Sequence, residues 1–130
     1  MLTHLRVKNF KCLQDVELAF LPFTVLIGQN DSGKSSLFEA IEGLAKAAIG
    51  GIQRVVTPNA TLADLVWQKD PQLSIEWEVT VKSGSTSFRY DLALRIGNPG
   101  PLRERLFINE NEILTLTNQN GQPTWVRLPC

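Results

Sequence analysis

The chain has 130 residues, of which 43% are hydrophobic, and its 13 basic and 13 acidic side chains give a formal net charge of zero. This length and composition are typical of one globular domain, and the balanced charge gives no electrostatic signal for nucleic-acid binding. Because no apolar run approaches the roughly 20 residues of a membrane span and no secretory signal opens the chain, we expect no membrane contact and a cytoplasmic location.

The N-terminal residues predict the start of a sheet. Residues 2–10 and 16–20 are predicted as two short strands around a turn at residues 11–15. Residues 23–27, Phe-Thr-Val-Leu-Ile, then form an unbroken apolar run. Apolar residues on both faces are typical of a central strand that is covered on both sides. We therefore expect residues 23–27 to be the central strand.

A phosphate-binding pattern, G-x-x-x-x-G-K-[ST], follows this run directly. The matching segment consists of Gly28, Gln29, Asn30, Asp31, Ser32, Gly33, Lys34, Ser35 and Ser36. Its glycines let successive backbone N–H groups point at phosphate oxygens, and the positive end of the next helix faces the same place. We expect Lys34 to reach the β- and γ-phosphates and Ser35 to place its hydroxyl on Mg²⁺. The alternative is a turn that merely links a strand to a helix, which the flanking elements disfavour.

A helix is predicted from Lys34 onward, because apolar residues recur at the spacing of a helix with one buried face. The glycine pair at residues 50–51 ends it. An irregular stretch follows, with one short helix in which Thr61 is the expected cap and Asp64 stands three residues later.

The second half of the chain changes to the alternation of β-strands. Two alternating segments around the turn at residues 83–87 predict a β-hairpin, and further strands extend it as an antiparallel meander. The predicted strands are 73–81, 88–96, 102–108, 112–117 and 123–128. We therefore predict an α/β fold, in which a strand, a phosphate loop and a helix precede an antiparallel β-meander.

Two groups of residues have alternative interpretations. The aromatic residues Trp67, Trp77, Phe88 and Tyr90 could stack on bases. Trp77, Phe88 and Tyr90 alternate with charged residues, which favours packing in the core. The run Arg103-Glu104-Arg105 could clamp a phosphate, but mixed charges on a strand favour a solvated face.

The chain offers no acidic residue at the end of a second buried strand, where hydrolysis would need one to hold Mg²⁺. Asp64 and Glu110 are the nearest candidates, and neither follows a strand of that kind. The predicted site therefore binds a phosphate group without an evident means of cleaving it.

Residues 5–41, about a third of the chain, resemble the opening of RecF-like, SMC-like and OLD-like ATPases of the ABC class. The shared order is a strand, an Asn-Phe-basic-small turn, a second strand and then G-x-N-x-x-G-K-S-S/N-L-x-x-A-I. Asn30 matches the asparagine of this pattern. Asp31 replaces the commonest glycine, and aspartate tolerates the left-handed backbone better than most residues. The segment from the hairpin to Arg103–Leu106 is more weakly similar to the OLD-like subset.

The resemblance implies that Lys11 approaches the nucleotide, with Asn9 and Phe10 shaping its turn. It also implies a signature motif, a Walker B aspartate with its catalytic glutamate and a switch histidine in a C-terminal lobe, and this sequence contains none of them. Such ATPases act as head-to-head dimers. We therefore expect residues 1–130 to be one nucleotide-binding lobe, with a core at 1–52 and a β subdomain at 73–130, that is inactive alone.

Two functions of different classes follow. In the first, the lobe binds ATP and Mg²⁺, and a C-terminal lobe or second subunit completes an ATPase that closes on DNA or a partner nuclease. DNA repair and phage defence are suggested by the resemblance alone. In the second, the chain is a non-catalytic module whose nucleotide regulates protein assembly. A small-molecule kinase is disfavoured because no arginine-rich lid follows the first helix.

Overall fold

The structure, a computed structural model, describes residues 1–29, 33–50, 62–96, 102–119 and 122–127. The first half of the chain contributes two strands and two helices: β1 (Leu2–Phe10), β2 (Leu13–Ala19), α1 (Lys34–Gly50) and α2 (Leu62–Leu65). A 3₁₀ helix, η2 (Trp67–Lys69), leads into the second half. The remaining strands are β3 (Ser74–Ser83), β4 (Thr86–Arg95), β5 (Arg103–Ile108), β6 (Asn111–Gln119) and β7 (Gln122–Arg127).

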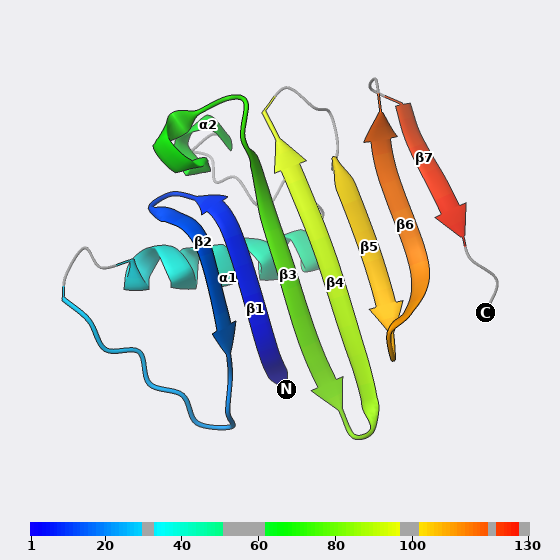
Figure 1. The fold of residues 1–130 in the computed structure, drawn as a ribbon, viewed down its shortest axis with the longest axis horizontal. Helices are drawn as coiled ribbons and strands as arrows, with labels where there is room; N and C mark the ends of the chain where they lie inside the picture. The colour runs from blue at the N-terminus through cyan, green and yellow to red at the C-terminus, as the bar shows by residue number, and fades with distance from the viewer. Residues whose placement is uncertain (30–32, 51–61, 97–101, 120–121, 128–130) are drawn as a thin grey trace.

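These strands form one antiparallel sheet in the order β2-β1-β3-β4-β5-β6-β7. The first hairpin joins the meander because β1 pairs with β3, which brings the two ends of the described chain into one layer. Helix α1 runs behind the sheet and crosses the strands at its β1–β3 side (Figure 1). The helix therefore covers the part of the sheet that is formed by the N-terminal hairpin and the first strands of the meander.

Strand alternation divides the sheet into an apolar face toward α1 and a charged face away from it. In β3, Ile75 and Trp77 are 1% exposed, whereas Glu76 between them points to the opposite face. The register pairs Trp77 with Leu92, which is also 1% exposed. The core therefore lies between α1 and the strands β1, β3 and β4.

The helix contributes its own apolar stripe to this core. Leu37 is 5% exposed and Ala40 is fully buried. The indole N–H of Trp77 donates a hydrogen bond to the carbonyl oxygen of Ala40 across 3.1 Å, which fixes α1 to β3. Phe10 packs against the same indole, with ring centroids 5.9 Å apart.

Several sequence predictions are confirmed. The N-terminal hairpin, the helix from Lys34 and the antiparallel meander are all present, and Trp77 is a core residue. The short second helix is also present, but its predicted cap, Thr61, lies outside the described residues.

The predicted central strand at residues 23–27 is wrong for this structure, because these residues have no regular secondary structure. Phe23, Val25 and Ile27 are 84%, 61% and 93% exposed. The physical reason is that a strand needs a neighbour for its N–H and C=O groups, and no strand of the described residues pairs with this segment. The α/β architecture is thus present only coarsely, as one antiparallel sheet with a helix against it.

Within the described residues, none of the helices has both the length and the apolar character needed to cross a membrane.

Candidate functional site

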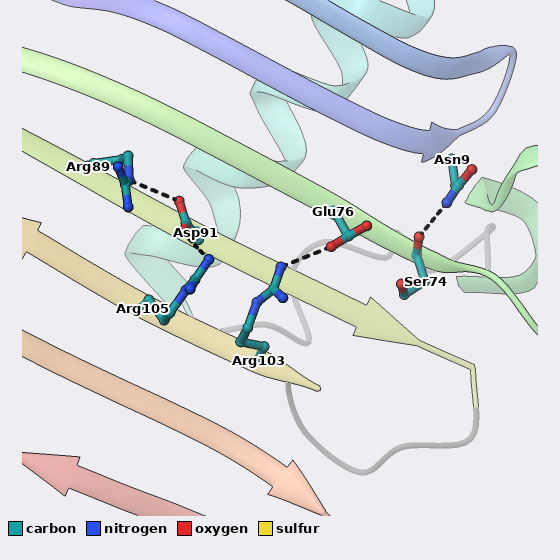
Figure 2. A network of polar contacts seen from close by, with 7 residues as sticks. All are labelled: Asn9, Ser74, Glu76, Arg89, Asp91, Arg103 and Arg105. Carbon is teal, nitrogen blue, oxygen red and sulfur yellow. Dashed lines mark hydrogen bonds and ion pairs between the residues drawn. The ribbon is translucent and has the colours of Figure 1, made fainter. Parts of the chain in front are cut away.

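The turn between β1 and β2 is held rigidly in an unusual backbone conformation. Asn9 and Lys11 have φ angles of 58° and 50°, in the left-handed region that few non-glycine residues adopt. The Asn9 side-chain amide donates to the carbonyl oxygen of Ser74 across 2.9 Å, as Figure 2 shows. The Lys11 N–H donates to the carbonyl oxygen of Leu65 across 2.6 Å. These two bonds fix the turn to β3 and α2, and they set the direction from which Lys11 reaches out.

The start of α1 requires glycine at position 33. Gly33 has a φ angle of +98°, where a side chain would strain the backbone. A Cβ atom there would also lie 3.2 Å from Leu13 Cδ2 and 3.5 Å from the Cys12 sulfur. The Leu37 N–H donates to the Gly33 carbonyl oxygen across 2.9 Å, as the first helical hydrogen bond. The amides before Leu37 are therefore not used by the helix, and its positive end faces the loop.

The Lys34 side chain reaches back to the described residues that precede the helix. Its ammonium donates a hydrogen bond to the carbonyl oxygen of Gly28. The ammonium therefore lies beside Gly28, the residue that opens the predicted motif. Ser35, next in the helix, is exposed, so its hydroxyl can be reached by a metal ion that accompanies a phosphate.

The β1–β2 turn contacts the first two turns of α1 through two side chains. The thiol of Cys12 donates to the hydroxyl oxygen of Ser36 across 3.3 Å. The ammonium of Lys11 forms an ion pair with the carboxylate of Glu39. The structure thus brings Lys11 to the helix that carries Lys34, Ser35 and Ser36.

Glu39 is the residue of this site that the sequence reasoning missed. It is 28 residues from Lys11, so no local pattern links the two. The available signal is helical spacing, because residues three apart share a helix face and Ser36 faces the same turn.

The predicted site residues have different outcomes. Asn30, Asp31 and Ser32 lie outside the described residues. Gly28 and Gln29 are described and exposed, and the segment from Gly33 to Ser36 forms the helix start. The described residues contain no group of three His, Cys, Asp or Glu side chains that could hold a metal ion.

The residues present fit a phosphate group. Three features lie at described residues of the predicted motif, Gly28 and 33–36. They are a glycine at which a Cβ would be strained and crowded, an ammonium bonded to the Gly28 carbonyl oxygen, and the N-terminal end of a 17-residue helix. The ammonium and the helix end each favour an anion, and the glycine allows the backbone to approach it closely.

The charged face of the sheet carries a separate network, in which the strands β3, β4 and β5 are joined by ion pairs (Figure 2). Asp91 is 3% exposed, accepts a 2.7 Å hydrogen bond from Arg105 and lies 3.6 Å from Arg89. Arg103 donates to Glu76 across 2.9 Å. These arginines are therefore engaged by carboxylates of the sheet itself.

The surroundings of this network carry charges of both signs, with one more basic than acidic side chain. Four basic and three acidic side chains line a hollow of about 140 Å³ between β1 and β5. Arg89 further stacks on Phe107, with its guanidinium 3.9 Å from the ring centroid. The arginines are half-buried, which differs from the solvated face that the sequence favours. We interpret the network as cross-strand stabilisation of the sheet.

Comparisons with known proteins identify the family of the chain. The family described as AAA ATPase domain matches residues 1–119. Over 42 residues, the chain is 45% identical to the OLD nuclease of Thermus scotoductus, a stretch that is 32% of this chain and 8% of the nuclease.

Two solved structures share the fold. One is the recombination mediator protein RecF of the RecFOR pathway, solved as RecF-ATPrS, with a TM-score of 0.60, 20% identity and coverage of 86% of this chain and 27% of RecF. The other comes from work on ATP-driven dimerization and DNA stimulated activation of SMC ATPases, with a TM-score of 0.50, 18% identity and coverage of 85% and 70%. At these identities the two structures show the fold alone.

These comparisons confirm the resemblance to RecF-, SMC- and OLD-like ATPases that the N-terminal motifs carry. The chain spans only 8% of the nuclease and 27% of RecF.

Proposed function

Because the chain belongs to the AAA ATPase domain family, we propose that it is a nucleotide-binding lobe that holds ATP and Mg²⁺ at residues 28–36. The observation that supports this most directly is the start of α1. There, the left-handed Gly33, the ammonium of Lys34 and the helix end meet at one loop. This combination is the one that a triphosphate requires.

The residues have distinct proposed roles. The backbone of residues 28–33 surrounds the phosphates, Lys34 neutralises the β- and γ-phosphates, and Ser35 and Ser36 present hydroxyls at the helix start. Ser35 holds Mg²⁺, and Lys11 reaches the nucleotide from the β1–β2 turn. When bound, Mg²⁺ offsets the phosphate charge, and ATP carries the phosphoryl group that a completed ATPase would transfer.

We propose that hydrolysis depends on a second lobe or subunit. The described residues form one sheet and one long helix, and the apolar side chains of Phe23, Val25 and Ile27 stand exposed beside the loop. A partner that supplies the signature and Walker B motifs would also cover this apolar row. On this proposal residues 1–130 are one lobe, which is inactive without its partner.

The proposed biological process is inferred from the names of the similar proteins. One is named as a nuclease, one as a recombination mediator, and the third is described by ATP-driven dimerization and stimulation by DNA. We propose a cytoplasmic ATPase that acts with DNA or a nuclease, in DNA repair or phage defence. The balanced charge of the chain adds no support of its own for the DNA role.

The test is ATP binding by the full chain and its Lys34→Ala variant. We expect Lys34→Ala to lower the ATP affinity by at least about tenfold, the factor that 1.4 kcal/mol represents. Lys46→Ala is the matched control, because Lys46 lies on the same helix and pairs with Glu42 at its exposed surface. Equal ATP affinity in Lys34→Ala and Lys46→Ala would contradict the proposed site.

A second variant tests the metal. Ser35→Ala should weaken the dependence of ATP affinity on Mg²⁺, because the hydroxyl is the side-chain ligand that we assign to the metal. Unchanged dependence would contradict that assignment. Steady-state phosphate release should be measured in the same samples, since tight binding without turnover in the presence of the partner lobe would favour the non-catalytic module.

A further inference from the structure

The ion pair between Lys11 and Glu39 connects the β1–β2 turn to α1 beside the phosphate loop. The two side chains are 34% and 45% exposed, so the pair lies at the surface, where an anion from solution can reach it. Lys11 cannot easily move its backbone, because its left-handed conformation and its bond to Leu65 fix the turn. Only its side chain is free to change partners.

The position of Glu39 along α1 determines where the ammonium of Lys11 is held. Glu39 follows Ser36 by three residues, so it lies about 4.5 Å further from the helix start, at 1.5 Å per residue. Cys12, next to Lys11, contacts Ser36. The pair with Glu39 therefore holds the ammonium of Lys11 on the second turn of α1, next to the helix end at which a phosphate would bind.

We propose that Glu39 competes with the nucleotide phosphates for Lys11, and that its carboxylate thereby weakens nucleotide binding at this site. This inference rests on the proposed function and assigns to Glu39 the role of a positioning residue, which acts through Lys11 and does not touch the nucleotide. A phosphate that binds Lys11 must first displace the Glu39 carboxylate.

The expected size of the effect follows from the exposure of the pair. Exposed ion pairs have small net energies, so the loss of the competing carboxylate should tighten ATP binding by about two- to fivefold. The effect is electrostatic and should decrease at high salt, because mobile ions screen exposed charges.

The experiment measures the ATP affinity of four forms of the full chain: unmodified, Glu39→Gln, Lys11→Ala and the double variant. We expect Glu39→Gln to bind ATP more tightly by about two- to fivefold, and more so at low than at high salt. We expect Lys11→Ala to bind more weakly. In the Lys11→Ala background, Glu39→Gln should have no effect, because the residue through which it acts is gone.

Glu42→Gln is the matched control. Glu42 lies on the same helix three residues beyond Glu39 and pairs with Lys46 across 2.9 Å. The Glu42→Gln variant removes one negative charge from α1 without altering Lys11. Its ATP affinity should therefore match that of the unmodified chain. A gain in Glu42→Gln as large as in Glu39→Gln would show a general charge effect and overturn the inference.

Two further results would also overturn it. One is an ATP affinity that is unchanged or weaker in Glu39→Gln, and the other is a gain that persists in the Lys11→Ala background, which would show direct repulsion of the nucleotide. These failures differ from failure of the proposed function. If the proposed nucleotide site is wrong, Lys34→Ala will bind ATP like the unmodified chain. If only the role of Glu39 is wrong, Lys34→Ala will still lose ATP affinity.

Discussion

The indole N–H of Trp77 donates a hydrogen bond to the carbonyl oxygen of Ala40, across the boundary between sheet and helix. Both residues are almost completely buried. We expect Trp77→Phe to lower the free energy of unfolding by about 2–3 kcal/mol, because it removes a buried hydrogen bond and leaves a cavity. Chemical denaturation monitored by far-ultraviolet circular dichroism would measure the loss.

Trp67→Phe is the control for this prediction, because Trp67 is only partly buried in η2. Its cost should stay below about 1 kcal/mol. Equal costs for the two tryptophans would contradict the assigned packing of α1 on β3.

A comparison of two glycines separates backbone strain from nucleotide binding. Gly33 and Gly84 both have left-handed φ angles, +98° and +59°. Replacing either with alanine should cost about 1–2 kcal/mol of stability from the backbone conformation alone. Gly33→Ala should also lower the ATP affinity, because its Cβ would meet Leu13 and Cys12 at the edge of the phosphate loop.

The control in this comparison is Gly84→Ala, because a Cβ at Gly84 has no atom within 4 Å. Its ATP affinity should be unchanged while its melting temperature falls. If both variants lose the same affinity, the loss reflects general destabilisation and Gly33 has no particular role in the loop.

The carboxyl of Asp15 provides a pH-dependent prediction. Arg6 donates two hydrogen bonds to it, of 3.1 and 3.0 Å, and these bonds together with the charge of Arg6 lower the pKa of Asp15 below its ordinary value of 3.8. A lowered pKa in the folded state means that the charged carboxylate stabilises the fold above pH 3.8. The contribution is lost as the pH falls below 3.8 and through the lower pKa of the folded state.

We therefore expect Arg6→Gln to raise the pKa of Asp15 toward 3.8, as measured by NMR titration of the carboxyl carbon. Lys8 pairs in register with Asp15 but acts on it through charge alone, as the weakest contribution. Lys8→Gln should therefore shift the pKa less. A larger shift in Lys8→Gln than in Arg6→Gln would contradict the order of these two effects.

The meander was predictable from the sequence because its signal is local. In β3 and most of β4, apolar and polar residues alternate, and this alternation assigns Trp77 and Leu92 to the apolar faces of their strands. The start of α1 was predictable for a similar reason, since Gly33 and Lys34 belong to one short motif. Local patterns thus specify elements and the faces that they bury.

Contacts between distant residues were not predictable in this way. The pair of Lys11 and Glu39 depends on how the β1–β2 turn packs on α1. No repeating pattern of residues in the sequence predicts that packing. The buried Asp91 likewise finds its arginines on its own and a neighbouring strand. Residues 23–27 show how a local pattern can also mislead. Their apolar run predicts a strand, but a strand also needs a hydrogen-bonded neighbour, and no strand of the described residues pairs with this segment.

The last prediction concerns the exposed apolar row of Phe23, Val25 and Ile27. Ile27 is 93% exposed, so Ile27→Asp should change the free energy of unfolding of the 130-residue chain by less than about 0.5 kcal/mol. If a partner lobe covers this row as proposed, the same variant should be strongly destabilising in the completed ATPase, because an aspartate would be buried without a partner. Differential scanning calorimetry of both forms would measure the two effects.

Ser85→Asp is the control for the added charge, because Ser85 lies in the exposed turn between β3 and β4. It should be tolerated in both forms. A cost for Ile27→Asp that appears only in the completed ATPase would mean that residues 23–27 gain a neighbour there, which is what their apolar pattern predicts. An equally small cost in both forms would mean that the row stays exposed, and the proposed partner lobe would then have to bind elsewhere.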